Sequence, residues 1–339
     1  MLRARDGSQG AGIEHYTRMI SSALLRLAPD QMHVVLPIGN IPFISRHAIV
    51  PLLARMSGSD ILLCPSGQIP LGWFGRSAIV IHDLAIYEHP EWFPGSGSLL
   101  DARSIRRAET IIAVSDATRQ QIARLFPDAA GKIVVVHPGV ETPTLARGRV
   151  GQEDIVLFVG TIEPRKNLVN AIAAFDAFLR MRPERSLTTR FVIAGKTGWK
   201  AEPVLEAIEQ TNAAWMRKAG GNVIRPLGYV TEDEKRSLYA QASCLFFPSL
   251  YEGFGLPALE AMAVGTPVIV SDRGALPEVC GDAALYVDPE NVEQMALALT
   301  QCTMLPDAMD EMVILGRKRA GEFTWERCAN RILAALGKN

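Results

Sequence analysis

Two carboxylates eight positions apart, Glu252 and Glu260, bracket a turn between an apolar segment and a helical pattern. The apolar segment 244–247 predicts a short strand, and the spacing in 256–264 predicts a helix that ends at Gly265. Free amide groups in the first turn of a helix attract anions such as phosphate. An ionised carboxylate only accepts hydrogen bonds, so it pairs with the hydroxyl groups of a sugar or ribose. We therefore interpret this turn as a site for a sugar nucleotide.

Two cations, Arg165 and Lys166, follow the apolar run 155–159, which predicts a strand, and precede a helical pattern over 167–180. Positive charges at the start of a helix oppose its dipole, and a bound polyanion would relieve the conflict. The pair also lies in the same half of the chain as the glutamate turn. We expect both side chains to bind a diphosphate, and the alternative is a pair of solvated surface charges.

The first half of the chain offers two weaker signals. Gly10 and Gly12 precede a helical pattern over 13–27, and glycines let the backbone approach a phosphate or sugar closely, although the alternative is an ordinary flexible turn. His82 follows the apolar run 78–81, at the expected carboxyl end of a strand. It could donate to a sugar hydroxyl or contact the reacting centre, and the alternative is a structural histidine.

Lys196 follows the apolar run 191–194, again at the expected carboxyl end of a strand. There it would contact phosphate or base, and the alternative is a solvated lysine. No two aspartates are separated by a single residue, so the D-x-D cation site of one class of sugar transferases is absent from the sequence. We therefore expect no metal, with the charge of a diphosphate met by cations and helix N-termini.

Composition narrows the class of protein. The chain has 339 residues, 48% of them hydrophobic and 21% charged, which predicts a globular protein of about two domains. A net charge of −1 and scattered basic residues argue against nucleic acid as a partner. The five cysteines are widely spaced and form no C-x-x-C pair, so neither a disulfide framework nor a zinc site is indicated. These features favour a reduced cytoplasm.

No apolar run is long enough to span a membrane, and the first residues lack the apolar core of a signal peptide, so we expect a cytoplasmic protein. Arg103, Arg106 and Arg107 form a small basic cluster on an expected helix. This cluster could touch lipid headgroups at the inner membrane surface if the acceptor is lipid-linked, and the alternative is a solvated helix face.

Short, continuous apolar runs alternate with helical patterns along the whole chain. Such runs are typical of parallel strands that are buried on both faces. In the first half the expected strands are 32–36, 61–64, 78–81, 110–114 and 133–136. In the second half they are 155–159, 191–194, 223–226, 244–247, 268–270 and 285–287. The pattern predicts an α/β protein with two doubly wound sheets.

The alternation lapses between residues 138 and 153, where proline, glycine and charged residues predict a linker. We therefore expect an N-terminal, acceptor-side domain over 1–149 and a C-terminal, donor-binding domain over 150–321. Residues 322–339 contain a helix, 325–336, that we expect to pack back on the first domain. Parallel sheets bind ligands beyond the carboxyl ends of their strands, so the site is expected between the two sheets.

Several runs resemble one known family. Residues 252–260, Glu-Gly-Phe-Gly-Leu-Pro-Ala-Leu-Glu, are similar to the E-x7-E signature of the retaining, metal-independent glycosyltransferases of GT-B family 4, the glycosyl transferases group 1. Residues 158–167 resemble the phosphate-binding turn of that family. Four further runs resemble its bacterial mannosyltransferase-type members: 82–84, 89–90, 104–115 and 194–199. The resemblance covers nearly the whole chain and implies a GT-B fold, in which two Rossmann-like domains face each other across a cleft.

The resemblance implies roles for four residues at the reacting centre. Glu252 would contact hydroxyls of the donor sugar, and Arg165 and Lys166 would neutralise the diphosphate. His82 would lie near the transferred sugar. Retention in this family is commonly ascribed to front-face attack assisted by the leaving phosphate, so no side chain is expected to act as a nucleophile.

The resemblance also implies a set of donor-binding residues. Glu260 would hold the ribose, while Lys196 and Tyr229 would border the nucleotide. The other positions would present backbone to the sugar and diphosphate; they are Gly10, Gly12, Gly253, Phe254, Gly255 and Leu256. No cofactor is implied, because the nucleoside-diphosphate sugar is a substrate.

We expect the chain to move a hexose, mannose from GDP-mannose, to a hydroxyl of a polysaccharide or lipid-linked glycan. The alternatives are a UDP-sugar-dependent glucosyl or galactosyl transferase and a sugar-nucleotide-binding protein with impaired catalysis. A nicotinamide oxidoreductase is a further alternative, but the segment at Gly10 and Gly12 lacks the third glycine of G-x-G-x-x-G. The apolar strand that precedes this loop in the family is short or missing here, which would weaken donor closure.

Overall fold

The structure is a computed structural model that describes residues 11–33, 45–94, 102–141 and 153–337. The chain folds into two compact units. The described part of the first unit comprises residues 11–33, 45–88, 102–139 and 323–337, and that of the second comprises 89–94, 140–141 and 153–322. Each unit is built around a parallel sheet, as the sequence predicted.

The unit boundaries differ from the expected division at 149/150. The chain passes from the first unit to the second after Gly139 and returns to the first at Phe323. Residues 89–94 belong to the second unit, although they follow a strand of the first. The indole N–H of Trp199 donates to the carbonyl oxygen of Trp92 at 2.6 Å, which ties this short segment to the second unit. A local sequence pattern does not reveal a contact between residues so far apart in the chain.

The first unit contains four described strands, all parallel, in the order β1-β2-β3-β4. They are β1 (Ile61–Cys64), β2 (Arg76–Ile81), β3 (Thr110–Ala113) and β4 (Ile133–Val135). β3 is buried at every position and β2 at all but its first, so apolar residues on both faces are shielded from water. The expected strand 32–36 is not formed at Met32 and His33, and its other residues lie outside the described part of the chain.

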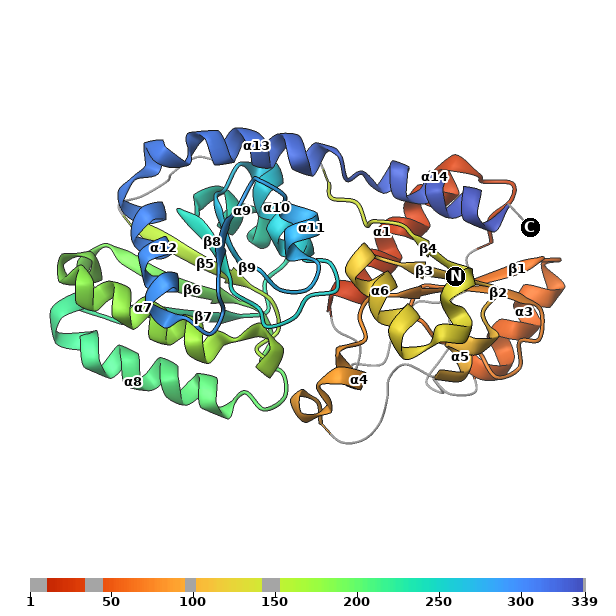
Figure 1. The fold of residues 1–339 in the computed structure, drawn as a ribbon, viewed down its shortest axis with the longest axis horizontal. Coiled ribbons are helices and arrows are strands. Elements are labelled where there is room, and N and C mark those ends of the chain that lie inside the picture. The colour runs from red at the N-terminus through yellow and green to blue at the C-terminus, as the bar shows by residue number, and fades with distance from the viewer. Residues whose placement is uncertain (1–10, 34–44, 95–101, 142–152, 338–339) are drawn as a thin grey trace. The chain divides into compact units, whose positions relative to one another are not determined.

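Helices cover both faces of this first sheet (Figure 1). The helices of this unit are α1 (Ala11–Leu27), α3 (Val50–Met56), α4 (Ala85–Glu88), α5 (Ala102–Arg107), α6 (Asp116–Leu125) and α14 (Trp325–Leu336). The unit also contains a π-helical turn at Ser45–Ile49 and a 3₁₀ turn at Pro127–Lys132. A further 3₁₀ turn, Pro90–Trp92, belongs to the second unit. Ser115 caps α6, because its hydroxyl accepts a hydrogen bond from the amide of Thr118 at 3.0 Å. The C-terminal helix α14 packs against α1 within the first unit.

The second unit contains a six-stranded parallel sheet in the order β10-β9-β8-β5-β6-β7. Its strands are β5 (Asp154–Val159), β6 (Thr189–Ala194), β7 (Ile224–Gly228), β8 (Cys244–Phe247), β9 (Val268–Ser271) and β10 (Leu285–Val287). Buried phenylalanine rings form the centre of its core, with Phe191 lying 5.4 Å from Phe175 and 6.0 Å from Phe246 between ring centroids. Pro226 is tolerated in β7 because this strand is at the edge of the sheet.

Two layers of helices cover the second sheet (Figure 1). One layer is α12-α7-α8 and the other is α9-α10-α13, as the contacts between neighbouring helices show. The helices are α7 (Leu168–Met181), α8 (Glu202–Ala219), α9 (Glu232–Gln241), α10 (Leu256–Val264), α11 (Leu276–Cys280), α12 (Val292–Met304) and α13 (Asp310–Gly321), with 3₁₀ turns at Pro164–Lys166, Pro183–Leu187 and Pro306–Met309. α9 opens with a capping box, in which the side chains of Thr231 and Glu234 each accept a hydrogen bond from the other residue's backbone amide.

The five cysteines are buried free thiols. Among the described residues, no helix combines the length and the apolar character that crossing a membrane would require.

Candidate functional site

The strand order of the second sheet reverses between β5 and β8. From β5 the chain winds outward through β6 and β7, and from β8 it winds the other way through β9 and β10. The loops that leave the carboxyl ends of β5 and β8 therefore diverge, and parallel α/β sheets bind ligands beyond the strand ends at such a switch point. Arg165 and Lys166 follow β5, and Glu252 follows β8, so the sheet places the predicted reacting residues at its switch point.

Lys166 and Glu252 form a buried ion pair at this point. The Lys166 Nζ lies 2.5 Å from Glu252 Oε1, and both side chains are less than a tenth exposed. The ammonium also lies 4.8 Å from the centre of the Phe247 ring, whose negative face favours a cation. Two residues 86 positions apart in the chain thus neutralise each other's charge inside the second unit.

Arg165 joins the same network from the side. Its Nη1 lies 3.3 Å from Glu252 Oε2, and its Nε lies 2.5 Å from Glu163 Oε1. The backbone also links the two loops, because the amide of Leu250 donates to the carbonyl oxygen of Arg165 at 2.8 Å. Glu252 therefore meets two cations, and Arg165 meets two carboxylates.

The structure corrects the expected conflict between these cations and a helix dipole. Arg165 and Lys166 lie in a 3₁₀ turn, and α7 begins only at Leu168. Glu163 and Glu252 already neutralise the two positive charges within the protein. A bound polyanion is thus not needed to stabilise the turn.

Burial and neighbouring charges shift the pKa values of both Lys166 and Glu252. Burial alone would raise the pKa of the Glu252 carboxyl, but the charges of Lys166 and Arg165 outweigh it and the pKa lies below its ordinary value. Burial, reinforced by the charge of Arg165, lowers the pKa of the Lys166 ammonium despite the two nearby carboxylates. The carboxylate is therefore ionised at neutral pH and ready to accept hydrogen bonds.

Asn167 holds the cation turn in place. Its backbone is left-handed, with φ of 60°, a conformation that asparagine tolerates better than most residues. Its side-chain amide donates to the carbonyl oxygens of Pro248 at 3.0 Å and Pro289 at 2.7 Å. These bonds fix the turn after β5 to the segments that follow β8 and β10.

The glutamate turn itself depends on glycines with positive φ. Gly255 precedes α10 with φ of 99°, and a Cβ there would lie 2.6 Å from Leu276 Cδ2. Gly274 has φ of 59°, and a Cβ there would overlap the backbone of Glu252. A positive φ and close packing, against Leu276 at Gly255 and against the backbone of Glu252 at Gly274, thus favour glycine at both positions. The predicted donor-binding positions Gly253, Phe254 and Leu256 lie in this turn, and Phe254 is buried.

Glu260 lies on α10, where two side chains of α9 already bind it. Lys235 Nζ lies 2.9 Å from Oε1, and the Tyr239 hydroxyl donates to Oε2 at 2.8 Å. Burial and then the nearby Glu260 carboxylate raise the pKa of Tyr239 well above its ordinary value, so the hydroxyl stays protonated as a donor. A carboxylate has about four acceptor sites, so Glu260 retains acceptor capacity for a ribose.

Lys196 and Tyr229 come together beyond the ends of β6 and β7. Lys196 Nζ lies 5.2 Å from the centre of the Tyr229 ring, and that ring is 64% exposed. An exposed ring beside a cation suits stacking on a nucleotide base. The close approach of the strand-end loops needs Gly195, where a Cβ would overlap the carbonyl group of Gly160.

His82 lies in the first unit, and a backbone carbonyl group fixes which ring nitrogen carries the hydrogen. Nε2 lies 2.9 Å from the carbonyl oxygen of Pro65, which can only accept, so Nε2 carries a hydrogen. Burial lowers the pKa of His82 despite this bond and the charge of Asp83. The ring is therefore neutral at pH 7, and Nδ1 offers an acceptor to a hydroxyl rather than the donor that the sequence suggested.

The remaining predicted residues of the first unit are two glycines. Gly12 lies in the first turn of α1 and has no heavy atom within 4 Å of its would-be Cβ. Gly10, with the short or missing first strand, lies outside the described residues.

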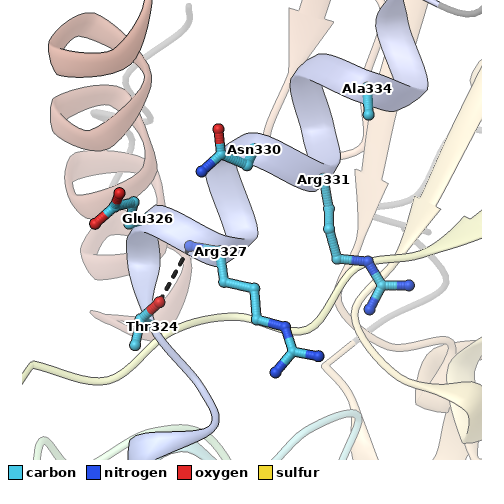
Figure 2. Close-up of a pocket in the computed structure, with 6 residues that line it drawn as sticks. All are labelled: Thr324, Glu326, Arg327, Asn330, Arg331 and Ala334. Carbon is cyan, nitrogen blue, oxygen red and sulfur yellow. Dashed lines mark hydrogen bonds between the residues drawn. The ribbon is translucent and has the colours of Figure 1, made fainter.

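A shallow hollow lies along α14 of the first unit (Figure 2). It is lined by Thr324, Glu326, Arg327, Asn330, Arg331 and Ala334, all from this helix region and all exposed. None of the predicted site residues lines it, and a hollow formed by exposed side chains of one helix does not enclose a ligand.

Comparisons with known proteins identify the family of the chain. Residues 146–319 match the family model of glycosyl transferases group 1, and residues 75–143 match that of Glycosyltransferase Family 4. The first match covers more than half of the chain. The chain therefore belongs to the glycosyl transferases group 1, and this assignment excludes the nicotinamide oxidoreductase.

Particular relatives are mannosyltransferases. The chain is 32% identical to O-antigen chain mannosyltransferase B of Escherichia coli, over 77% of this chain and 70% of the relative. It is 29% identical to an MMP alpha-(1->4)-mannosyltransferase of Mycolicibacterium hassiacum, over 70% of this chain and 56% of the relative. The crystal structure of Anabaena HepE in complex with UDP and glucose matches with a TM-score of 0.73 and 15% identity, over 100% of this chain and 99% of that one. The predicted GT-B fold class is confirmed.

Sequence reasoning did not single out three residues that shape the site. Glu163 neutralises Arg165, Asn167 ties the turn to two other loops, and Tyr239 orients Glu260. A signal existed for Asn167, because asparagine is favoured directly before a helix and tolerates a left-handed backbone. For Tyr239 no local signal exists, since its partner lies on another helix.

Proposed function

We propose that this protein transfers mannose from GDP-mannose to a hydroxyl of a polysaccharide or lipid-linked glycan, with retention of anomeric configuration and without a metal ion. The observation that carries the proposal is the buried Glu252 carboxylate held between Arg165 and Lys166 at the switch point of the second sheet. Mannosyltransferases among the relatives support the choice of sugar.

The charges at this point suit the reaction. The bond between the anomeric carbon and the diphosphate oxygen breaks, a bond to the acceptor oxygen forms, and the acceptor proton leaves with the diphosphate. Negative charge grows on the leaving group, and the preorganised cations Lys166 and Arg165 would stabilise it. Glu252 would accept hydrogen bonds from hydroxyls of the donor sugar and so fix its position.

Donor and carboxylate compete for the same cations. Glu252 neutralises Lys166 and Arg165 within the protein, so a diphosphate must draw both cations toward itself. Glu252 then shares its lone pairs between the cations and the sugar. This exchange keeps the site charge-balanced before and after donor release, which limits the cost of burying ions.

Roles at the other predicted positions follow the same logic. Glu260 would hold the ribose, and Lys196 with Tyr229 would border the base. His82 and Gly12 of the first unit would serve the transferred sugar and the diphosphate. A role of Arg103, Arg106 and Arg107 at the inner membrane surface belongs to the same proposal, for an acceptor that is carried on a lipid.

A donor panel tests the proposal. Thermal unfolding is measured with GDP-, UDP- and ADP-sugars, and transfer is then measured with the donor that stabilises the protein. A ligand at 100 times its dissociation constant stabilises by about 2.7 kcal/mol, and we expect this for GDP-mannose. Stabilisation by UDP-glucose or UDP-galactose instead would favour the glucosyl or galactosyl alternative. Binding without transfer to any acceptor would favour a sugar-nucleotide-binding protein.

The variant Lys166→Met tests the site within this panel. We expect it to reduce donor stabilisation below detection and transfer by at least about 100-fold, because a single electrostatic contact to developing charge contributes about 2.7–4 kcal/mol. Lys318→Met removes an exposed lysine of α13 and is the matched control, with both properties unchanged. Donor binding and transfer at wild-type levels in Lys166→Met would refute the assignment.

A further inference from the structure

Four large apolar side chains of the first unit are exposed on neighbouring segments. Phe74 is 77% exposed, Met56 76%, Leu52 57% and Leu71 41%. Single exposed apolar residues are common on protein surfaces, but a contiguous group marks an interaction site. We refer to these four side chains as the apolar patch.

Contacts between two segments hold the apolar patch together. Leu52 and Met56 lie one turn apart on α3 and so share a side of the helix. The loop 71–74 runs beside this helix, because the amide of Gly72 donates to the carbonyl oxygen of His47 at 3.0 Å, just before α3. A Cβ on Gly72 would lie 3.5 Å from the ring of Pro51 in the first turn of α3.

Two guanidinium groups flank the most exposed member of the patch. The Phe74 ring centre lies 6.0 Å from the Cζ of Arg55 and 5.8 Å from the Cζ of Arg107. Arg107 is further fixed by a hydrogen bond to the carbonyl oxygen of Trp73. Of the basic cluster expected on α5, Arg107 therefore borders the patch, while Arg106 lies over Phe126 at 6.0 Å.

The charge around the patch has one sign. The segments 45–56, 65–76 and 102–107 contain arginines but neither aspartate nor glutamate. Arg76 is neutralised by Glu109, with both carboxylate oxygens 3.0 Å from its Nε. Among the residues that the structure describes, no carboxylate pairs with Arg55 or Arg107, so both retain their charge toward solvent.

An exposed ring flanked by two exposed arginines, neither of them paired with a carboxylate among the described residues, fits an anionic lipid surface. Apolar side chains insert at the boundary between headgroups and acyl chains, and arginines bind the phosphates around them. An apolar centre with positive charge on both sides matches the acyl boundary and the anionic headgroups of such a bilayer. The combination therefore favours a bilayer over a protein partner.

We propose that the apolar patch, with Arg55 and Arg107, is a peripheral docking surface for anionic phospholipid. This inference rests on the proposed function in one respect: docking would bring the transferase to a lipid-linked acceptor. Docking requires neither donor nor acceptor, so its test is independent of transfer.

Flotation with vesicles tests the docking surface. The full chain is mixed with vesicles of phosphatidylcholine alone or with added phosphatidylglycerol, at low and high salt. We expect binding only to the anionic vesicles, weakened by salt. Phe74→Ser should lower the partition coefficient about tenfold and Arg55→Gln about fivefold. Ile314→Ser removes a 68% exposed apolar side chain of the second unit and should have no effect.

Three results would overturn the inference. They are equal binding to neutral and anionic vesicles, binding of Phe74→Ser equal to wild type, and light scattering that shows a dimer disrupted by Phe74→Ser. The last result would mean that a second copy covers the patch. Donor stabilisation in the Phe74→Ser variant should equal that of wild type, which separates failure of docking from failure of the proposed function.

Discussion

At the scale of single residues, the Lys166–Glu252 pair is better explained by function than by stability. Removing two charges from water costs several kcal/mol, and a buried ion pair often contributes no more than apolar residues of similar volume would. Arg165, Lys166 and Glu252 meet here beyond the carboxyl ends of β5 and β8, and the pKa values of Lys166 and Glu252 are lowered. Such clustering of perturbed groups is typical of functional sites.

The same physics changes what a substitution at this pair does. The sequence alone predicts that Lys166→Ala and Glu252→Ala abolish or strongly reduce transfer and leave the fold intact, because each removes a contact to a charged or transferring group. Breaking a buried pair leaves one charge uncompensated and costs about 3–5 kcal/mol. Adding Glu252→Gln to Lys166→Met should restore part of this stability but none of the transfer, so the double variant separates folding from function.

The neutral state of His82 predicts a pH dependence. Its folded-state pKa lies below 6.5 because of burial, so near that pH the native protein binds fewer protons than the unfolded chain. The free energy of unfolding should therefore fall as pH drops below about 6.5, by at most about 1.4 kcal/mol per pH unit from this group. Urea unfolding at pH 7.5 and 5.5 measures the slope.

His82→Gln is the control for this titration, because glutamine does not ionise in the range. The variant should lose part of the acid destabilisation seen in wild type. Identical slopes in the two proteins would show that His82 keeps its ordinary pKa.

At the scale of elements, the turn between β8 and α10 depends on close backbone packing. Gly274 lies against the backbone of Glu252, and the amide of Ala275 donates to the carbonyl oxygen of Glu252 at 2.9 Å. The segment after β9 thus supports the segment after β8. The position of the Glu252 carboxylate is determined by two neighbouring loops rather than by its own turn alone.

Gly274→Ala tests this support. The new methyl group would meet backbone atoms of Glu252, and φ of 59° is unfavourable for alanine, so we expect a loss of at least about 1–3 kcal/mol and weaker donor binding. Denaturant unfolding and donor titration measure the two effects. Gly221→Ala is the matched control in the same unit, since a Cβ there has no atom within 4 Å. Equal stability of both variants would contradict this account of the turn.

At the scale of the whole molecule, the chain is two compact units, each with its own parallel sheet and core. Nearly all predicted donor-binding side chains lie in the second unit, while His82 and Gly12 lie in the first. Residues 89–94 also belong to the second unit, although they lie between β2 and β3 of the first unit in the sequence. Donor binding should therefore stabilise the second unit selectively.

Calorimetry tests this selectivity. We expect two unfolding transitions, of which the donor raises only one, by the stabilisation that its concentration and affinity dictate. Lys166→Met should abolish the shift. A single transition that moves as a whole with donor would instead show that the units unfold together.

Local patterns accounted for most elements of the described chain. β8, α10 and α14 begin and end where the sequence predicted. The helix boundaries are set by short-range chemistry, such as Gly265 after α10 and the side chain of Thr324, which caps α14. The π-helical turn and α3 were not predicted, because 45–56 lacks a cap and a clear period; Ile49 makes no side-chain capping bond there.

The sequence by itself determined the class of fold, the family and the residue types of the site, because spacing, glycines and charge are local properties of the chain. Tertiary structure decided that Glu252 is buried between Lys166 and Arg165, and that Nδ1 of His82 is left as an acceptor. It also decided that Phe74 lies between Arg55 and Arg107. Each of these depends on contacts between residues distant in sequence, which only the folded sheets and their packed loops bring together.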